Sequence, residues 1–251
     1  MSLGRRKNTH RWNDKVTNEL FLWKKLVRND RVIGPSEIVQ SKEEAYFWLS
    51  KGFGSFSGLL EKWDRPSILD LGPVTNKNIS YYGELGWKVH AHDLLLEYQE
   101  ACLQPLEEVD DDEDPPPNPI EGILAELKFE PGSLHGVLCW DVLDRLPLIW
   151  TRELIRRISE SLDEGGVILA IFGAKSNDEN GQTHRGFRIQ GDKYLEPIMD
   201  DDVCLERYDY GNGEIMSLFS SFKVLNFYMM KNNFREILVQ KQPQASLKIS
   251  A

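Results

Sequence analysis

The sequence is poor in cysteine and has no long apolar run. Its three cysteines, Cys102, Cys139 and Cys204, are odd in number and widely spaced, which excludes a disulfide framework and a zinc pattern. We therefore expect a reducing, cytoplasmic setting. No apolar stretch approaches the roughly 20 residues that span a bilayer, and no apolar segment follows the basic N-terminus as in a secretory signal. We expect no membrane partner.

Positive charge is also in short supply. The 251 residues carry 30 Lys and Arg against 40 Asp and Glu, a net charge of -10 with a pI near 5.1. This balance argues against a broad nucleic-acid surface. Residues 1–50 differ, with ten basic and six acidic side chains, and Glu107–Asp114 holds seven acids. We interpret both segments as solvated surface.

The usual motifs of catalysis are missing as well. No Ser-His-Asp set, P-loop or CxxC pair occurs in the sequence. His90 and His92 alternate on one predicted strand, but no third ligand lies at a useful spacing, so we predict no metal site. No residue has the spacing of a general base, and we name no catalytic residue.

Alternating strand and helix signals begin near Ser67. Apolar residues make up 41% of the chain, enough for one substantial core. Short apolar runs predict strands, and apolar residues at helical spacing predict the helices between them. In chain order we expect a strand at 67–72, a helix at 75–85 ended by Gly86, a strand at 87–93, a helix at 95–103, strands at 121–127 and 135–141, a helix from Pro147, and a strand at 167–173.

The last third of the chain no longer alternates regularly between strand and helix signals. Residues 187–195 read as a short extended excursion, and residues 213–219 as a helix. Two strands at 222–230 and 234–241 are joined by a short connection, which is typical of a hairpin. Repeated β-α units before a terminal hairpin predict an α/β, Rossmann-like fold with a mostly parallel sheet and an antiparallel pair near its edge.

The domain organisation follows from these changes of pattern. Residues 1–65 read as an N-terminal helical annex, in which "SKEE" at 41–44 has the form of a capping box before a helix at "AYFWL". We expect the α/β domain at 66–241 and a tail at 242–251. The acids and prolines of residues 105–119 predict a disordered insertion.

A candidate cofactor site lies where the first predicted strands end. Ligands of open α/β sheets bind beyond the carboxyl ends of the strands. The first strand ends at Asp70, and Gly72 lets backbone approach a ligand closely. Asp93 ends the second strand 23 residues after Asp70, about the offset of an acid that binds ribose hydroxyls. Asp93 is equally suited to cap the helix that follows it.

Five segments resemble, in order, those of the class I S-adenosylmethionine-dependent methyltransferases. The resemblance spans Pro66 to Lys241 and implies that family's fold and cofactor, with methyl transfer to a small molecule. The matching segments are "ILDLG" at 68–72, "VHAHDL" at 89–94, "GVLCWDVLDRLP" at 136–147, "ISESLDEGGVILAIFG" at 158–173, and the closing "LFSSFKVLNFYMMKNNFREILVQK" at 218–241.

The resemblance also implies which residues would bind the cofactor. Trp140 and Asp141 follow the fourth strand, where the family places side chains that face substrate or adenine. The alternative is a buried Trp with a helix-capping Asp. The loop that contains His184 and Arg185 caps the active site in the family, which makes both residues candidates for substrate contact, but we interpret the segment as a plain surface loop. The implied cofactor-binding residues are Asp70, Gly72, Pro73, Asn76, Asp93, Leu94, Trp140 and Asp141.

The first turn departs from the family. Two or three glycines are usual there, but this chain has Gly72 alone, followed by Pro73-Val74-Thr75-Asn76. In one interpretation Thr75 and Asn76 cap the next helix, whose amides still face the cofactor. In the other, Val74 or Asn76 fills the turn, cofactor binding is lost, and the protein is an inactive module that binds a protein partner. A nicotinamide-dependent enzyme fits poorly because of the terminal hairpin.

Further departures affect the remaining motifs. The acid that commonly follows the family's third strand has no clear match, and Glu126 is the nearest candidate. The family's frequent Phe-Asp pair is His135-Gly136 here, and a histidine common in the fourth-strand motif is Arg145.

Overall fold

Six strands form the main sheet, in the order β3-β2-β4-β5-β9-β8. The first four strands along the chain are parallel, whereas β9 runs antiparallel to both β5 and β8. This arrangement confirms the predicted α/β class I methyltransferase-like fold with its terminal antiparallel pair. The strands are β2 (Ser67–Asp70), β3 (Lys88–Ala91), β4 (Leu134–Trp140), β5 (Leu162–Phe172), β8 (Lys223–Met229) and β9 (Arg235–Gln240).

The structure is a computed structural model that describes residues 47–104, 118–176, 183–199, 205–230 and 233–243. The predictions for residues 1–46, for the acidic insertion at 105–117 and for most of the C-terminal tail lie outside these ranges. The proposed boundaries of annex, domain and tail therefore stay predictions.

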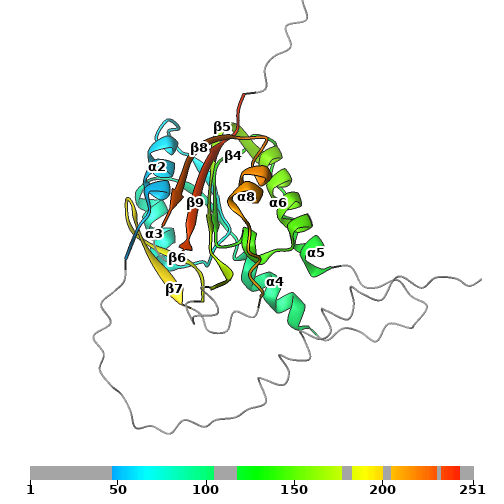
Figure 1. Cartoon of the computed structure of the whole chain (residues 1–251). Coiled ribbons are helices and arrows are strands. Elements are labelled where there is room, and N and C mark those ends of the chain that lie inside the picture. The colour runs from blue at the N-terminus through cyan, green and yellow to red at the C-terminus, as the bar shows by residue number, and fades with distance from the viewer. Residues whose placement is uncertain (1–46, 105–117, 177–182, 200–204, 231–232, 244–251) are drawn as a thin grey trace, which may run out of the picture. The chain divides into compact units, whose positions relative to one another are not determined.

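Helices cover both faces of the main sheet (Figure 1). On one face, α2 (Lys51–Leu60) and α3 (Asn76–Glu84) bury aromatic side chains such as Phe53, Phe56 and Tyr82. The other face is covered by α4 (Leu94–Leu103), α5 (Pro119–Glu126), α6 (Leu148–Ser161) and α8 (Asn212–Leu218). Because both faces are covered, β5 is fully apolar from Val167 to Phe172, as expected for a central strand.

Local signals in the sequence set several helix ends. The Thr75 hydroxyl accepts from the Asn78 amide at 3.1 Å and caps α3, and Gly86 has the predicted left-handed backbone with φ of +70°. Pro147 precedes the first residue of α6. These predictions are confirmed. They could be made from the sequence because each helix end depends on only a few neighbouring residues.

A second, smaller sheet has the order β1-β7-β6, and we call it the minor sheet. Its strands are β1 (Trp48–Leu49), β7 (Tyr194–Met199) and β6 (His184–Gly191), all antiparallel. The predicted extended excursion is confirmed as part of this sheet. The helix predicted at "AYFWL" is wrong, since Trp48 and Leu49 pair with β7 and the helix begins only after the Ser50 cap.

The strand predicted at 121–127 is also wrong. These residues lie in α5, where Asn118 caps the first turn and Ile120, Ile123 and Leu124 face the core at helical spacing. A short apolar run fits either element, and the Asn-Pro start decides for the helix. Glu126 therefore ends a helix and is exposed, so it does not follow a strand toward the site.

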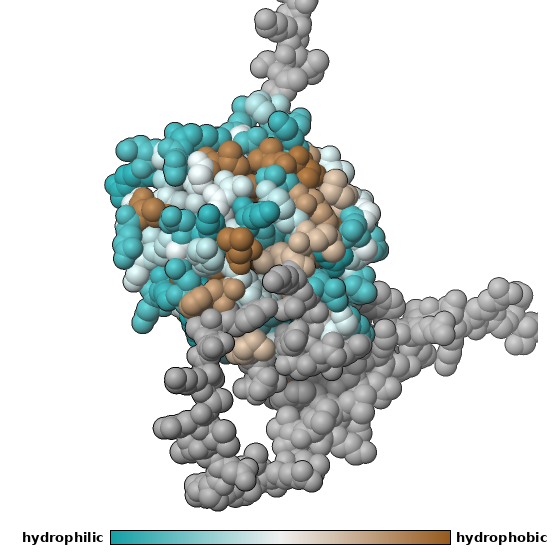
Figure 2. Space-filling view, turned by 60° about the vertical axis from the view of Figure 1, so that its left-hand side comes forward, coloured by the Kyte–Doolittle hydropathy of each residue, from teal (hydrophilic) through white to brown (hydrophobic). Residues whose placement is uncertain are grey.

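The face that carries α2 and α3 is mostly hydrophilic, with apolar side chains gathered in one part and isolated elsewhere (Figure 2). Val74, Ile79 and Leu85, in and beside α3, are among the exposed apolar residues. No helix in the described part of the chain is long and apolar enough to cross a bilayer.

Candidate functional site

The topological switch point of the sheet lies between β2 and β4. From β2 the chain passes to β3 on one side and later returns to β4 on the other. Chain connections leave in opposite directions at such a point, so a ligand crevice is expected beyond the carboxyl ends of the two strands. Asp70 ends β2 and Trp140 ends β4.

The indole of Trp140 lies at this switch point, against Asp70 and Gly72. Its Nε1 donates to Oδ1 of Asp70 at 2.5 Å, and the side chain is 1% exposed. The ring lies so close to Gly72 that a Cβ on that residue would overlap Cδ1 of the indole. Phe53 and Phe187 pack against Trp140, each with a ring-centroid distance of 5.8 Å. Buried aromatic side chains thus pack against the first turn and the ends of β2 and β4.

Asp70 is a buried carboxylate surrounded by donors. Besides Trp140, it accepts from the hydroxyl of Tyr82 at 2.6 Å and from the amide of Gly72 at 3.0 Å. Burial raises the pKa of Asp70 to about 6, although all three hydrogen bonds favour the ionised form. The group therefore braces the turn and the indole at once.

Strand β6 of the minor sheet lies directly on the first turn. The backbone at Gly186 touches Pro73 so closely that a Cβ would overlap the proline ring. The side-chain amide of Asn78 holds β6 in place, since it donates to the Phe187 carbonyl at 3.0 Å and accepts from the Ile189 amide at 2.8 Å. The backbone of β6 thus covers the first turn.

Val74 and Asn76, which one of the two interpretations places in a filled turn, do not fill it. Val74 is 58% exposed, and Asn76 is exposed at the start of α3. Trp140, from a strand 70 residues further along the chain than Asp70, takes that place instead. The sequence of the turn could not reveal that Trp140 packs there, because Trp140 is so far from the turn along the chain.

Asp93, the expected ribose ligand, contacts the Leu96 amide and the Arg185 guanidinium among the described residues. Its Oδ1 accepts from the Leu96 amide at 3.2 Å, which confirms the capping role, and its Oδ2 lies 3.4 Å from Nη1 of Arg185. The neighbouring Leu94 is fully buried in the core. The guanidinium of Arg185 thus lies against the acid that the resemblance assigns to ribose.

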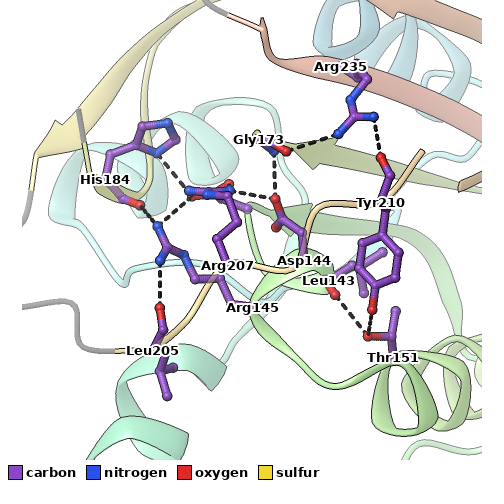
Figure 3. A network of polar contacts seen from close by, with 11 residues as sticks. Leu143, Asp144, Arg145, Thr151, Gly173, His184, Leu205, Arg207, Tyr210 and Arg235 are labelled. Atoms are coloured by element: carbon purple, nitrogen blue, oxygen red, sulfur yellow. Dashed lines mark hydrogen bonds and ion pairs between the residues drawn. The ribbon is translucent and has the colours of Figure 1, made fainter. Parts of the chain in front are cut away.

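A buried ion cluster closes the carboxyl ends of β4 and β5 (Figure 3). Arg207 binds both oxygens of Asp141, with Nη2 2.7 Å from Oδ2, and its Nη1 lies 2.5 Å from Oδ2 of Asp144. The Gly173 amide also donates to Asp144, at 2.7 Å. The Arg207 and both Asp side chains are 0% exposed. Burial raises the pKa of Asp144, and the charge of Arg207 opposes this shift.

Arg145 and His184 extend the cluster toward the minor sheet. Arg145 donates to the Leu205 carbonyl at 2.8 Å and to the His184 carbonyl at 3.4 Å. The His184 ring is buried, with Nδ1 3.4 Å from Oδ2 of Asp141. These contacts tie His184, the first residue of β6, to the segment that follows β4, so the plain surface loop that we predicted for His184 is wrong.

Arg235 of β9 fixes the segment that follows Arg207. It donates to the Tyr210 carbonyl at 2.5 Å and to the Gly173 carbonyl at 3.1 Å. Residues 205–211 therefore cross the ends of β4 and β5 and are held there by buried hydrogen bonds (Figure 3).

The expected site residues divide into three groups. Asp70, Gly72 and Trp140 are in mutual contact, and Asp141 joins the ion cluster instead. The others are dispersed between a covered turn, the core, a helix cap and the surface: Pro73, Leu94, Asp93 and Asn76. That these residues bind a cofactor stays a prediction.

Sequence reasoning missed Arg207 and Arg235. Both are buried arginines, and no local pattern distinguishes them from surface arginines, because their partners lie 66 and 25 residues away. Among the described residues no group of three or more His, Cys, Asp or Glu could hold a metal ion. Cys139 is a core residue, as predicted.

The arrangement can be compared with the needs of S-adenosylmethionine. That cofactor would use the space over Gly72 and the carboxylate of Asp93, according to the resemblance. Trp140 lies against Gly72, and Arg185 lies beside Asp93. Both positions that the resemblance assigns to the cofactor are thus in contact with side chains of this chain, and we derive no step through the cofactor.

No protein-family model matches the sequence, and no curated protein sequence matches it. Solved structures of similar fold include the Burkholderia thailandensis 1,6-didemethyltoxoflavin-N1-methyltransferase with bound S-adenosylhomocysteine. It is 15% identical, with a TM-score of 0.45 and coverage of 96% of this chain and 94% of that one. A Clostridium acetobutylicum S-adenosylmethionine-dependent methyltransferase is 13% identical, with a TM-score of 0.45 over 90% and 99% of the two chains. These likenesses concern the fold.

Proposed function

We propose that this chain is a methyltransferase-fold protein that works without S-adenosylmethionine, as a non-enzymatic module that binds a protein partner. The observation that carries the proposal is the indole of Trp140, buried at the switch point over Gly72. When the ligand edge of an α/β sheet is filled by its own side chains, the outer surface is left to perform the function.

Three separate elements support the closure. Trp140 comes from β4, Arg185 from β6, and Arg207 from the segment before α8. Removing a buried Trp contact costs about 3–5 kcal/mol in cores, and moving the indole aside would cost a similar amount. About 4 kcal/mol weakens apparent affinity roughly a thousandfold, which would turn a micromolar ligand into a millimolar one.

A second candidate is a small-molecule methyltransferase, as the resemblance implies. It is favoured by the positions of Asp70, which ends β2, and Asp93, which follows the adjacent strand β3 as the cap of α4. This function requires Trp140 and Arg185 to leave their present places. The small-molecule acceptor and the cytoplasmic location stay predictions.

Calorimetry separates the two candidates. We would titrate S-adenosylmethionine and S-adenosylhomocysteine into the wild-type protein and into Asp93→Ala. The proposal predicts no saturable heat at micromolar concentrations of either ligand. Micromolar binding, about -8 kcal/mol, that weakens in Asp93→Ala would contradict it and support the methyltransferase.

A variant tests the role of the indole directly. Trp140→Ser removes the ring from the crevice, and we expect it to gain measurable binding of S-adenosylhomocysteine. Trp150→Ser, in α6, is the matched control because that tryptophan lies on the opposite face of the sheet, and it should gain none. Equal binding by both variants would show that Trp140 is not the obstacle.

A further inference from the structure

Two carboxylates at the end of β4 hold one guanidinium group in a geometry typical of ligand recognition. Arg207 is bidentate on Asp141 and also reaches Asp144. Its guanidinium lies over the ring of Phe234, 5.9 Å from the centroid. A planar fork on paired oxygens beside an aromatic face is how proteins recognise guanidinium compounds.

The backbone of Asp141 is adapted to this contact. Asp141 has φ of +55°, in the left-handed region that non-glycine residues seldom adopt. Such backbone persists only where surrounding contacts hold it. One of the four carboxylate oxygens accepts no hydrogen bond from the described residues. It is Oδ1 of Asp144, which is buried. A buried acceptor is thus left beside the guanidinium with no donor among the described residues.

The charge balance shows what the site requires. Without Arg207, the described residues of the cluster would hold two carboxylates, Asp141 and Asp144, near one guanidinium, that of Arg145. Arg145 does not replace the missing cation, because its Nη2 is 3.9 Å from Asp141 and its guanidinium donates to two carbonyls. The vacated site would therefore need a cation.

We propose that Asp141 and Asp144 form a guanidinium-binding site, that Arg207 occupies it as an internal ligand, and that a small guanidinium compound takes the same place when the Arg207 side chain is removed. This inference rests on the proposed function, which holds that side chains of this chain occupy the ligand edge of the sheet. It adds that the carboxylates of Asp141 and Asp144 at this edge bind a cation of the same chain. Arg207 would then occupy the edge of the sheet beyond β4 and β5, as Trp140 does between β2 and β4.

The test is chemical rescue of Arg207→Ala. We would measure the thermal midpoint of the full chain with ethylguanidinium and with ethylurea, which has a similar shape but no charge. We expect millimolar ethylguanidinium to raise the midpoint of Arg207→Ala by about 3 °C or more, with no rise for ethylurea or for wild type. Equal responses to the two compounds would overturn the proposal.

Two further measurements complete the test: rescue of a double variant, and circular dichroism in case Arg207→Ala is unfolded. Asp141→Asn combined with Arg207→Ala should lose the rescue, because the bidentate carboxylate is gone. If Arg207→Ala is unfolded alone, recovery of its far-ultraviolet circular dichroism with ethylguanidinium, but not with ethylurea, is the supporting result. Failure of both compounds to restore it would count against the site.

Arg207→Lys and Arg207→Met separate charge from shape. A site built for the guanidinium fork should make Arg207→Lys almost as unstable as Arg207→Met. A lysine variant as stable as wild type would show that any cation suffices, which contradicts a guanidinium site. Calorimetry with S-adenosylmethionine decides the proposed function independently, so failure of one proposal can be distinguished from failure of the other.

Discussion

At Gly72 the missing side chain is what allows Trp140 to reach Asp70 across the switch point. The turn needs no cofactor to explain its glycine, because the indole already uses the space. A residue that would be assigned to ligand binding from its motif thus has a packing role in this chain. Gly186 also has a packing role, because its backbone lies on Pro73.

We predict that Gly72→Ala destabilises the protein by about 1–3 kcal/mol, because a methyl group would overlap the buried indole. Gly58→Ala is the control, since a Cβ there meets nothing within 4 Å and Ala favours the helix by about 0.5–1 kcal/mol. Urea unfolding monitored by circular dichroism measures both changes. A neutral Gly72→Ala would mean that the indole moves aside at little cost.

At the scale of elements, the contact between α3 and β6 decides whether the first turn is open. Asn78, in the first turn of α3, supplies both a donor and an acceptor to the backbone of β6. A side-chain amide mimics the edge of a neighbouring strand in this way. The minor sheet is therefore fixed over the turn by polar contacts as well as by the buried Phe187 and Ile189.

We predict that Asn78→Ala costs about 2–4 kcal/mol of unfolding free energy, because it leaves the Phe187 carbonyl and the Ile189 amide buried without partners. Asn76→Ala, two residues earlier and exposed, should change stability by no more than about 0.5 kcal/mol. Chemical denaturation of the two variants provides the comparison. Similar small effects would show that β6 is held by apolar packing alone.

For the whole molecule, the main sheet buries acids that ordinarily face water. Burial raises the pKa of Asp70, of Asp144 and of Glu236, whose carboxylate accepts from the Gly52 amide at 2.8 Å. In the folded state these groups hold protons at a pH where the unfolded chain has released them. Each group therefore contributes stability at acidic pH that is lost as the pH rises through its folded pKa.

Asp70 allows this pH dependence to be measured. Its pKa rises from 3.8 to about 6, so its ionisation should cost roughly 3 kcal/mol by the time the pH exceeds 6. Asp70→Asn keeps the size of the side chain and does not titrate. We expect the stability of the variant relative to wild type to increase by about that amount between pH 4 and pH 7. A constant difference across this range would contradict the raised pKa.

The sequence by itself determined the fold and its local boundaries. Strands and helices alternate because apolar residues recur with the period of each element, and Thr75, Gly86 and Pro147 act on neighbouring backbone only. Where the run was short, as at 121–127, periodicity alone did not separate strand from helix. The Asn-Pro pair that decided it for α5 is a local signal that the strand prediction did not use.

Only the tertiary structure decided the state of the candidate site. The sequence indicated Asp70, Gly72 and Trp140 as its residues, but whether an indole or a ligand lies over Gly72 depends on how β4 packs against Phe53 and Phe187. The same is true of Arg207, whose two acidic partners lie more than 60 residues away. Packing and charge pairing between distant segments leave no periodic pattern in a single chain, because they depend on positions that exist only after folding.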